Sequence, residues 1–260
     1  MWDLWLLVVF GFFIGILASM VGVDGGVFIV PILTFFYGFK VKAATATSLT
    51  AVIFTAIAST INYRKQKRIY YKTGLVLAVT TTPGAYLGAY VATITDERLP
   101  GLTFGVFMIL VALRTIFKLF RRKGEDKMRP MRTDTETVNS RKTMVIGAGL
   151  GFFGGFASGL LGIGGGTVVV PIMTIALGMP IHSATATSMF TMIFTAISGV
   201  TKYSQANLVN LPVALLLAAG TVFGAQVGAY TSRRLSGRKL SIIFALVLIV
   251  SSVNMIMKYK

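Results

Sequence analysis

Small hydroxyl-bearing residues recur at two places in the chain, each time in strongly apolar surroundings. The run A-T-A-T-S occupies Ala44–Ser48 and again Ala184–Ser188. Hydroxyls near a helix start can cap free backbone N–H groups. They can equally bind a solute, and the partial positive charge of the helix N-terminus then favours an anion. The runs therefore predict contacts to a small anion from Thr45, Thr47, Ser48, Thr185, Thr187 and Ser188.

A glycine-rich stretch precedes each hydroxyl run. The first reads G-V-D-G-G-V-F-I-V-P and the second G-I-G-G-G-T-V-V-V-P. Glycine adopts non-helical conformations at little cost, and proline removes a helical hydrogen bond. The stretches therefore predict unwound backbone, although close helix packing through small residues is the alternative. Matched breaks in the two halves of a transporter typically mark its substrate-binding site. The predicted substrate contacts therefore include Gly22, Gly25, Gly26, Gly162, Gly164, Gly165 and Gly166. Pro31 and Pro171 are the predicted helix-breaking residues.

Long apolar segments must position these residues. Of the 260 residues, 55% are hydrophobic and 13% are charged. About 18 or more apolar residues cross the hydrocarbon core as a helix. The sequence predicts an all-α polytopic membrane protein, with spans at Trp2–Val21, Ala43–Ile61, Gly74–Ile94, Leu99–Phe117, Met144–Leu161, Ser183–Thr201, Leu211–Tyr230 and Leu240–Met257.

The chain also repeats itself. A shift of 140 residues aligns both glycine stretches and both hydroxyl runs without a gap. We predict a first transmembrane repeat at 1–120, a linker at 121–142 and a second repeat at 143–260. The short apolar segments Val27–Tyr37 and Thr167–Leu177 decide the topology. If they cross the membrane, each repeat crosses five times and the second repeat is inverted. If they do not, each repeat crosses four times and the two repeats are parallel.

The distribution of positive charge favours the inverted arrangement. Cytoplasmic loops are enriched in Lys and Arg. The five-crossing topology places 19 basic residues inside and 6 outside. It also makes the linker cytoplasmic and both termini extracytoplasmic. The formal net charge of +17 is explained by these loops, so no nucleic-acid partner is expected.

Other polar residues carry weaker predictions. Asp24 is the acidic residue of the first glycine stretch, between two predicted membrane segments, which suggests proton coupling, with a protonated donor or a structural cap as the alternatives. Coupling, gating or anion attraction is predicted for Lys42, His182, Asn62, Tyr63, Lys202 and Tyr203, although tyrosines at such places are more often interfacial anchors. The sequence shows no catalytic constellation, metal-ligand cluster or cofactor motif, so we expect a protein that is not an enzyme and needs no cofactor.

The paired motif G-x-x-G-G-x-x-x-x-P followed by (A/S)-A-T-A-T-S resembles that of the TauE/SafE sulfite exporter family of inner-membrane proteins. The resemblance spans nearly the whole chain. It implies a secondary transporter, usually an exporter, of sulfite or small organosulfonates. The glycine-proline signature falls on Gly22, Gly25, Gly26 and Pro31 and on Gly162, Gly165, Gly166 and Pro171.

Three functions stay open from the sequence: a transporter that works by alternating access, a passive anion channel, and a membrane assembly or lipid-binding protein. The hydroxyl runs make one sharp prediction. Thr47→Val combined with Thr187→Val should leave the protein folded and abolish anion binding.

Overall fold

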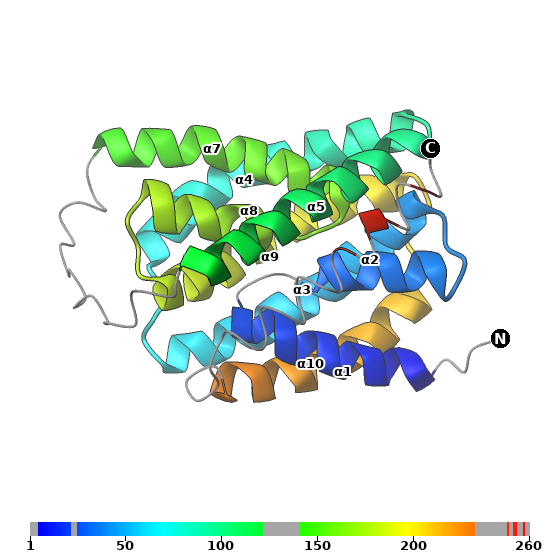
Figure 1. The fold of residues 1–260 in the computed structure, drawn as a ribbon, viewed down its shortest axis with the longest axis horizontal. Helices are drawn as coiled ribbons and strands as arrows, with labels where there is room; N and C mark the ends of the chain where they lie inside the picture. The colour runs from blue at the N-terminus through cyan, green and yellow to red at the C-terminus, as the bar shows by residue number, and fades with distance from the viewer. Residues whose placement is uncertain are drawn as a thin grey trace.

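A computed structural model describes residues 5–21, 25–121, 141–231 and the single residues 249, 252, 253 and 257. All regular elements in these ranges are helices (Figure 1). They are α1 (Trp5–Val21), α2 (Gly26–Phe35), α3 (Val41–Lys65), α4 (Tyr71–Ile94), α5 (Arg98–Arg121), α7 (Arg141–Leu161), α8 (Gly166–Pro171), the π-helix η2 (Ile172–Ala176), α9 (Ile181–Gln205) and α10 (Leu211–Thr231). The predicted all-α fold is confirmed. The linker and the last predicted span lie almost wholly outside the described residues.

Four of these helices are long and apolar enough to cross a membrane: α3, α4, α9 and α10. Helices α1, α2, α5 and α7 contribute shorter apolar stretches. The outward faces of the bundle carry large apolar side chains, such as Phe153 and Phe223, both about 70% exposed. This is a multi-pass membrane protein.

The helices repeat with the period seen in the sequence. Helix α3 spans 41–65 and α9 spans 181–205, and α4 and α10 begin at Tyr71 and Leu211. The short helices α2 and α8 begin at Gly26 and Gly166. The 140-residue shift therefore relates structural units as well as motifs.

Glycine-mediated crossings join the two repeats. Gly11 and Gly15 of α1 pack against Leu217 and Thr221 of α10. Their order along both helices shows that α1 and α10 run parallel. In the equivalent crossing, Gly84 and Gly88 of α4 contact the backbone of Phe152 and Phe156 in α7. Small residues at such positions let helix backbones approach closely. Each repeat thus lends its first helix to the other.

The corresponding helices of the two repeats run in opposite directions. Hydrogen bonds pair the start of α3 with the start of α10, and the start of α9 with the start of α4. Helices α1, α3 and α10 are therefore parallel to one another, as are α4, α7 and α9. Only residues 66–70 separate α3 from α4, and there the chain reverses; in Figure 1, α1 begins at the right and α7 at the left. This is the inverted arrangement that the positive charges favour; the sidedness of the termini stays a prediction.

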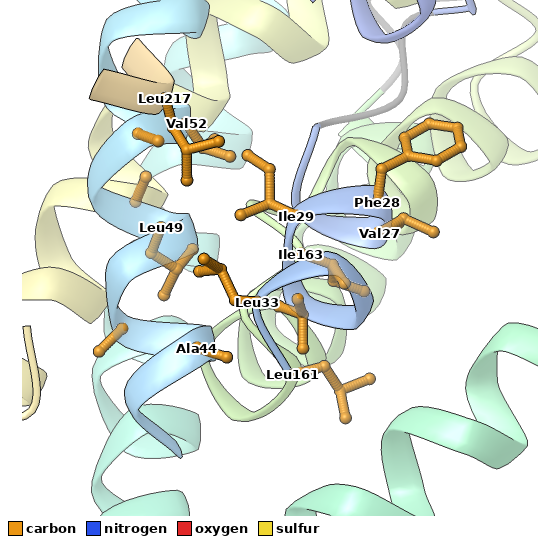
Figure 2. Close-up of a cluster of buried hydrophobic side chains, with 14 of the residues drawn as sticks. Val27, Phe28, Ile29, Leu33, Ala44, Leu49, Val52, Leu161, Ile163 and Leu217 are labelled. Atoms are coloured by element: carbon orange, nitrogen blue, oxygen red, sulfur yellow. The ribbon is translucent and has the colours of Figure 1, made fainter. Parts of the chain in front are cut away.

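The short helices are buried inside the bundle. Eight of the ten residues of α2 are buried. Figure 2 shows Ile29 and Leu33 of α2 directed toward Leu49 of α3, with Ile163 nearby. Ten helical residues extend about 15 Å, roughly half of the hydrocarbon core. Helix α2 is therefore too short to cross alone; Gly26 at its start is buried, whereas Phe35 at its end is exposed.

Candidate anion-binding site

The second glycine stretch is unwound, as predicted. Gly162, Gly164 and Gly165 have φ angles of +72°, +63° and +99°. This left-handed region is disfavoured for residues with a Cβ atom. All three glycines are buried, which fits the rule that irregular backbone at membrane depth is enclosed by protein. We call residues 162–165 the second glycine turn.

Only part of the first glycine stretch is described. Gly22 and Asp24 lie outside the described residues, so their predicted roles stay predictions. Gly25 is buried and precedes α2 with φ of −63°. Pro31 lies buried inside α2, and Pro171 ends α8 just before the π-helical turn η2. Both prolines therefore sit within short or irregular helices.

The two glycine stretches touch each other. A Cβ atom on Gly26 would lie 2.3 Å from the carbonyl oxygen of Gly162 and 2.9 Å from the Cα atom of Ile163. A Cβ atom on Gly162 would lie 2.7 Å from the Cα atom of Thr45. Gly26, Gly162 and the start of α3 therefore meet at distances that only glycine permits.

The first hydroxyl run turns two of its side chains to this junction. Thr45 and Ser48 are three residues apart on α3, and so they share one face. Ser48 Oγ donates to the carbonyl oxygen of Gly162 at 3.2 Å. Thr45 Oγ1 is fully buried and has no hydrogen-bond partner among the described residues. Its proton is available for a ligand.

The second hydroxyl run lies at the start of α9. Thr185 is 6% exposed and Ser188 is buried. Ser188 Oγ donates to the carbonyl oxygen of Thr185 at 2.8 Å. From the repeat we expect this run to lie near the first glycine stretch, but residues 22–24 of that stretch are outside the described residues. Its role in anion binding stays a prediction.

Thr47 and Thr187 have a structural partner that the sequence did not indicate. Thr47 Oγ1 accepts a hydrogen bond from the backbone N–H of Asn210 at 3.1 Å, and Thr187 Oγ1 accepts one from that of Tyr70 at 3.0 Å. Asn210 and Tyr70 directly precede α10 and α4, where N–H groups lack helical acceptors. Each threonine therefore caps a helix of the other repeat, and its own hydroxyl proton can still be donated.

Tyr63 and Tyr203 are buried and do not anchor the protein at a membrane surface. Tyr63 Oη donates to the carbonyl oxygen of Ser19 at 2.6 Å, and Tyr203 Oη to that of Gly159 at 2.7 Å. Both carbonyl groups belong to the last turn of α1 or α7, where a helix leaves them unpaired. The tyrosines therefore fix the helix ends from which the glycine stretches begin.

Lys42 and His182 lie at the starts of α3 and α9. Lys42 Nζ donates to the carbonyl oxygens of Thr93 and Thr95 at the end of α4. A cation there complements the helix dipole. His182 is exposed. Their predicted gating roles stay predictions.

Asn62 and Lys202 occupy equivalent positions in the repeats and make different contacts. Asn62 Nδ2 donates to Gln226 Oε1 at 2.6 Å. Lys202 Nζ lies 4.9 Å from the ring centroid of Tyr90 and 5.9 Å from that of Tyr86, which places it in cation–π range. Both residues lie near the ends of their helices, remote in sequence from the hydroxyl runs, and anion attraction by them stays a prediction.

Ser158 is a polar residue that the sequence reading missed. It is fully buried, and its Oγ has no hydrogen-bond partner among the described residues. That oxygen lies 3.5 Å from the position of a Cβ atom on Gly165. A 140-residue shift aligns Ser158 with Ala18. Ser158 therefore does not belong to a matched motif, and only a search for differences between the repeats would have found it.

Comparisons with known proteins identify the family. A family model described as sulfite exporter TauE/SafE matches residues 7–255. The chain belongs to the TauE/SafE family. It is 33% identical to the probable membrane transporter protein YunE of Bacillus subtilis, over 96% of both chains. A probable membrane transporter protein of Methanocaldococcus jannaschii is 30% identical over 97% of this chain and 95% of its own.

A third relative, a probable membrane transporter protein of Xylella fastidiosa, is 27% identical over 95% of this chain and 92% of its own. No solved structure matches the chain. The family and its relatives are membrane transporters and not enzymes, and this TauE/SafE protein is a membrane transporter.

Proposed function

We propose that this transporter moves sulfur-containing oxyanions, such as sulfite or small organosulfonates, outward across the inner membrane by alternating access. The observation that carries the proposal is the junction of Gly26, the second glycine turn and the start of α3. Backbone unwinds there inside the protein, and hydroxyl groups line it.

The burial of the hydroxyl runs supports alternating access over a passive channel. Thr45, Thr47 and Ser48 are fully buried, and Thr185, Thr187 and Ser188 are at most 6% exposed. A site enclosed in this way must open to release its ligand, and opening one side at a time is the alternating-access cycle. A channel would need a permanently wet path past these side chains.

Asp24 is the proposed coupling group. Its carboxyl belongs to the stretch that joins α1 to α2, next to the described Gly25. An ionised carboxylate there would repel an anion, so protonation linked to binding would couple export to a proton.

Ligand-dependent thermal stability tests the proposed substrate class. The detergent-purified protein is heated with sulfite, sulfate, taurine, sulfoacetate, acetate or chloride at constant ionic strength. A ligand that binds only the folded form stabilises it by about 2.7 kcal/mol at one hundred times its Kd. We expect a rise in Tm of several degrees with sulfite or a sulfonate, and none with acetate or chloride.

A flat response over the whole panel would contradict the oxyanion proposal while leaving the fold and the family unaffected. An equal response to chloride would instead favour a general anion site. Asp24→Asn provides the coupling test, because it should keep sulfite binding and remove its dependence on pH.

A further inference from the structure

We infer that Thr45 and Ser158 together contact the transported sulfur oxyanion at the second glycine turn. The inference rests on the proposed function and deepens it. It assigns a substrate contact to Ser158 and makes the site asymmetric, although the two halves of the protein are repeats.

The first observation is that these two hydroxyls lack the partner that helical hydroxyls usually find. Threonines in the interior of membrane helices commonly donate to the carbonyl four residues earlier. In the described helices, Thr50, Thr55 and Thr191 do so at 2.9–3.2 Å. Thr45 and Ser158 do not, and both are fully buried. An unpaired buried hydroxyl costs about 1–3 kcal/mol, which a bound acceptor would recover.

The second observation is that both hydroxyls belong to residues in contact with one turn. Thr45 packs against Gly162, at the start of the turn. Ser158 lies beside Gly165, at its end, and its carbonyl oxygen accepts from the N–H of Gly162 at 2.9 Å. The two residues come from α3 and α7, so they approach the turn from different repeats.

The third observation is that the first repeat lacks the equivalent hydroxyl. The counterpart of Ser158 is Ala18, which is also fully buried. The counterpart of Gly165 is Gly25, and its nearest side chain is that of Ile14, 2.9 Å from a Cβ atom placed there. The environment of Gly25 is therefore apolar where that of Gly165 is polar.

Ser19 and Ser59 also have buried oxygens without a described partner. They belong with the first glycine stretch, because Tyr63, one turn after Ser59, bonds to the Ser19 carbonyl. Residues 22–24 of that stretch are outside the described residues, so these two serines carry no part of the inference.

The chemistry of the pair suits an oxyanion of sulfur. Such an anion presents several oxygens around one centre and accepts hydrogen bonds from separate directions. Two O–H donors can each contact a different oxygen of such an anion. Hydrogen bonds to a charged partner are also stronger than those between neutral groups.

The test compares Ser158→Ala with Ser198→Ala, a matched control on α9. Ser198 Oγ donates to the carbonyl oxygen of Thr82 at 2.7 Å, so it has a structural partner. Binding of sulfite to the full-length protein in detergent is measured by calorimetry, beside Tm without ligand. Ser158→Ala should weaken sulfite binding about ten- to a hundredfold and leave the ligand-free Tm unchanged or raised. Ser198→Ala should lower the ligand-free Tm and keep wild-type affinity.

Three outcomes separate the claims. If wild-type protein binds no sulfur oxyanion, the proposed function fails and this inference fails with it. If wild-type protein binds sulfite and Ser158→Ala binds within twofold of it, only this inference is overturned. If Ser158→Ala does not fold, Thr45→Val gives the same decision, because valine keeps the methyl group that packs against Gly162. We expect Thr45→Val to lower the affinity for sulfite at least tenfold.

Discussion

Gly162→Ala is expected to lower the free energy of unfolding by about 2–5 kcal/mol and to abolish transport. The φ angle of +72° costs a residue with a Cβ atom about 1–2 kcal/mol. The new Cβ atom would also lie 2.7 Å from the Cα atom of Thr45, and overpacking of this kind typically costs about 1–3 kcal/mol. The side-chain methyl of Thr45 would lie closer still, at 2.6 Å, but rotation of that side chain would not remove the clash with the backbone Cα atom.

Gly178→Ala is the matched control for Gly162→Ala. Gly178 has a φ angle of +65°, but a Cβ atom there would meet nothing within 4 Å. It therefore isolates the backbone term, and a loss of about 1–2 kcal/mol with retained transport is expected. Thermal unfolding in detergent and flux in vesicles measure both effects. Equal stability losses in the two variants would show that the junction at Thr45 is not tightly packed.

Thr47→Val combined with Thr187→Val has the second largest expected effect. The sequence alone predicts a folded protein that no longer binds an anion. The structure adds a loss of stability, because valine leaves the backbone N–H groups of Asn210 and Tyr70 without their acceptors. An unsatisfied N–H group costs about 1–3 kcal/mol at each site. We therefore expect a clearly lower Tm together with the loss of sulfite binding.

The corresponding serine variants separate shape from hydrogen bonding. Thr47→Ser with Thr187→Ser keeps both hydroxyls and should retain Tm within a few degrees, together with anion affinity. Binding is measured well below the Tm of each variant, so that reduced stability does not imitate reduced affinity. Unchanged affinity in the valine single and double variants would exclude these two threonines from the site, and the stability loss would then be their whole role.

Much of the architecture follows from the sequence because it depends on local signals. Apolar spans and their polar borders predict α10 at Leu211–Tyr230, and the observed helix is Leu211–Thr231. The breaks are also local, since the glycines at 162–165 permit the φ angles that the turn requires. The 140-residue shift predicts that both repeats use the same elements, and the described helices do, except that the counterpart of α2 is divided into α8 and η2.

The pairing of side chains could not be predicted in the same way, because it depends on which helices become neighbours. The hydroxyl run reads as one cluster in sequence. On α3, however, Thr45 and Ser48 face the second glycine turn, whereas Thr47 faces the start of α10. The crossing of each first helix to the other repeat is not visible in a pattern of apolar residues.

The glycines show how one residue type serves two purposes. Gly84 and Gly88 lie within α4, and a Cβ atom on either would lie 2.0–2.3 Å from a carbonyl oxygen of α7. They follow the close-packing alternative. Gly162 and Gly165 instead supply left-handed backbone. Of these glycines, only Gly162 and Gly165 lie directly before a short helix, α8, which ends at a proline. This position distinguishes them from Gly84 and Gly88.

Flux of radiolabelled sulfite into and out of proteoliposomes tests the central claim most directly, namely that the buried junction is a transport site for sulfur oxyanions. Wild-type protein should give saturable flux with a steep temperature dependence, competition by small sulfonates, and none by acetate. Gly178→Ala should retain this flux and Ser158→Ala should lose most of it. Flux that rises linearly with sulfite concentration and depends little on temperature would show a channel, and no flux above protein-free vesicles would contradict the proposed substrate.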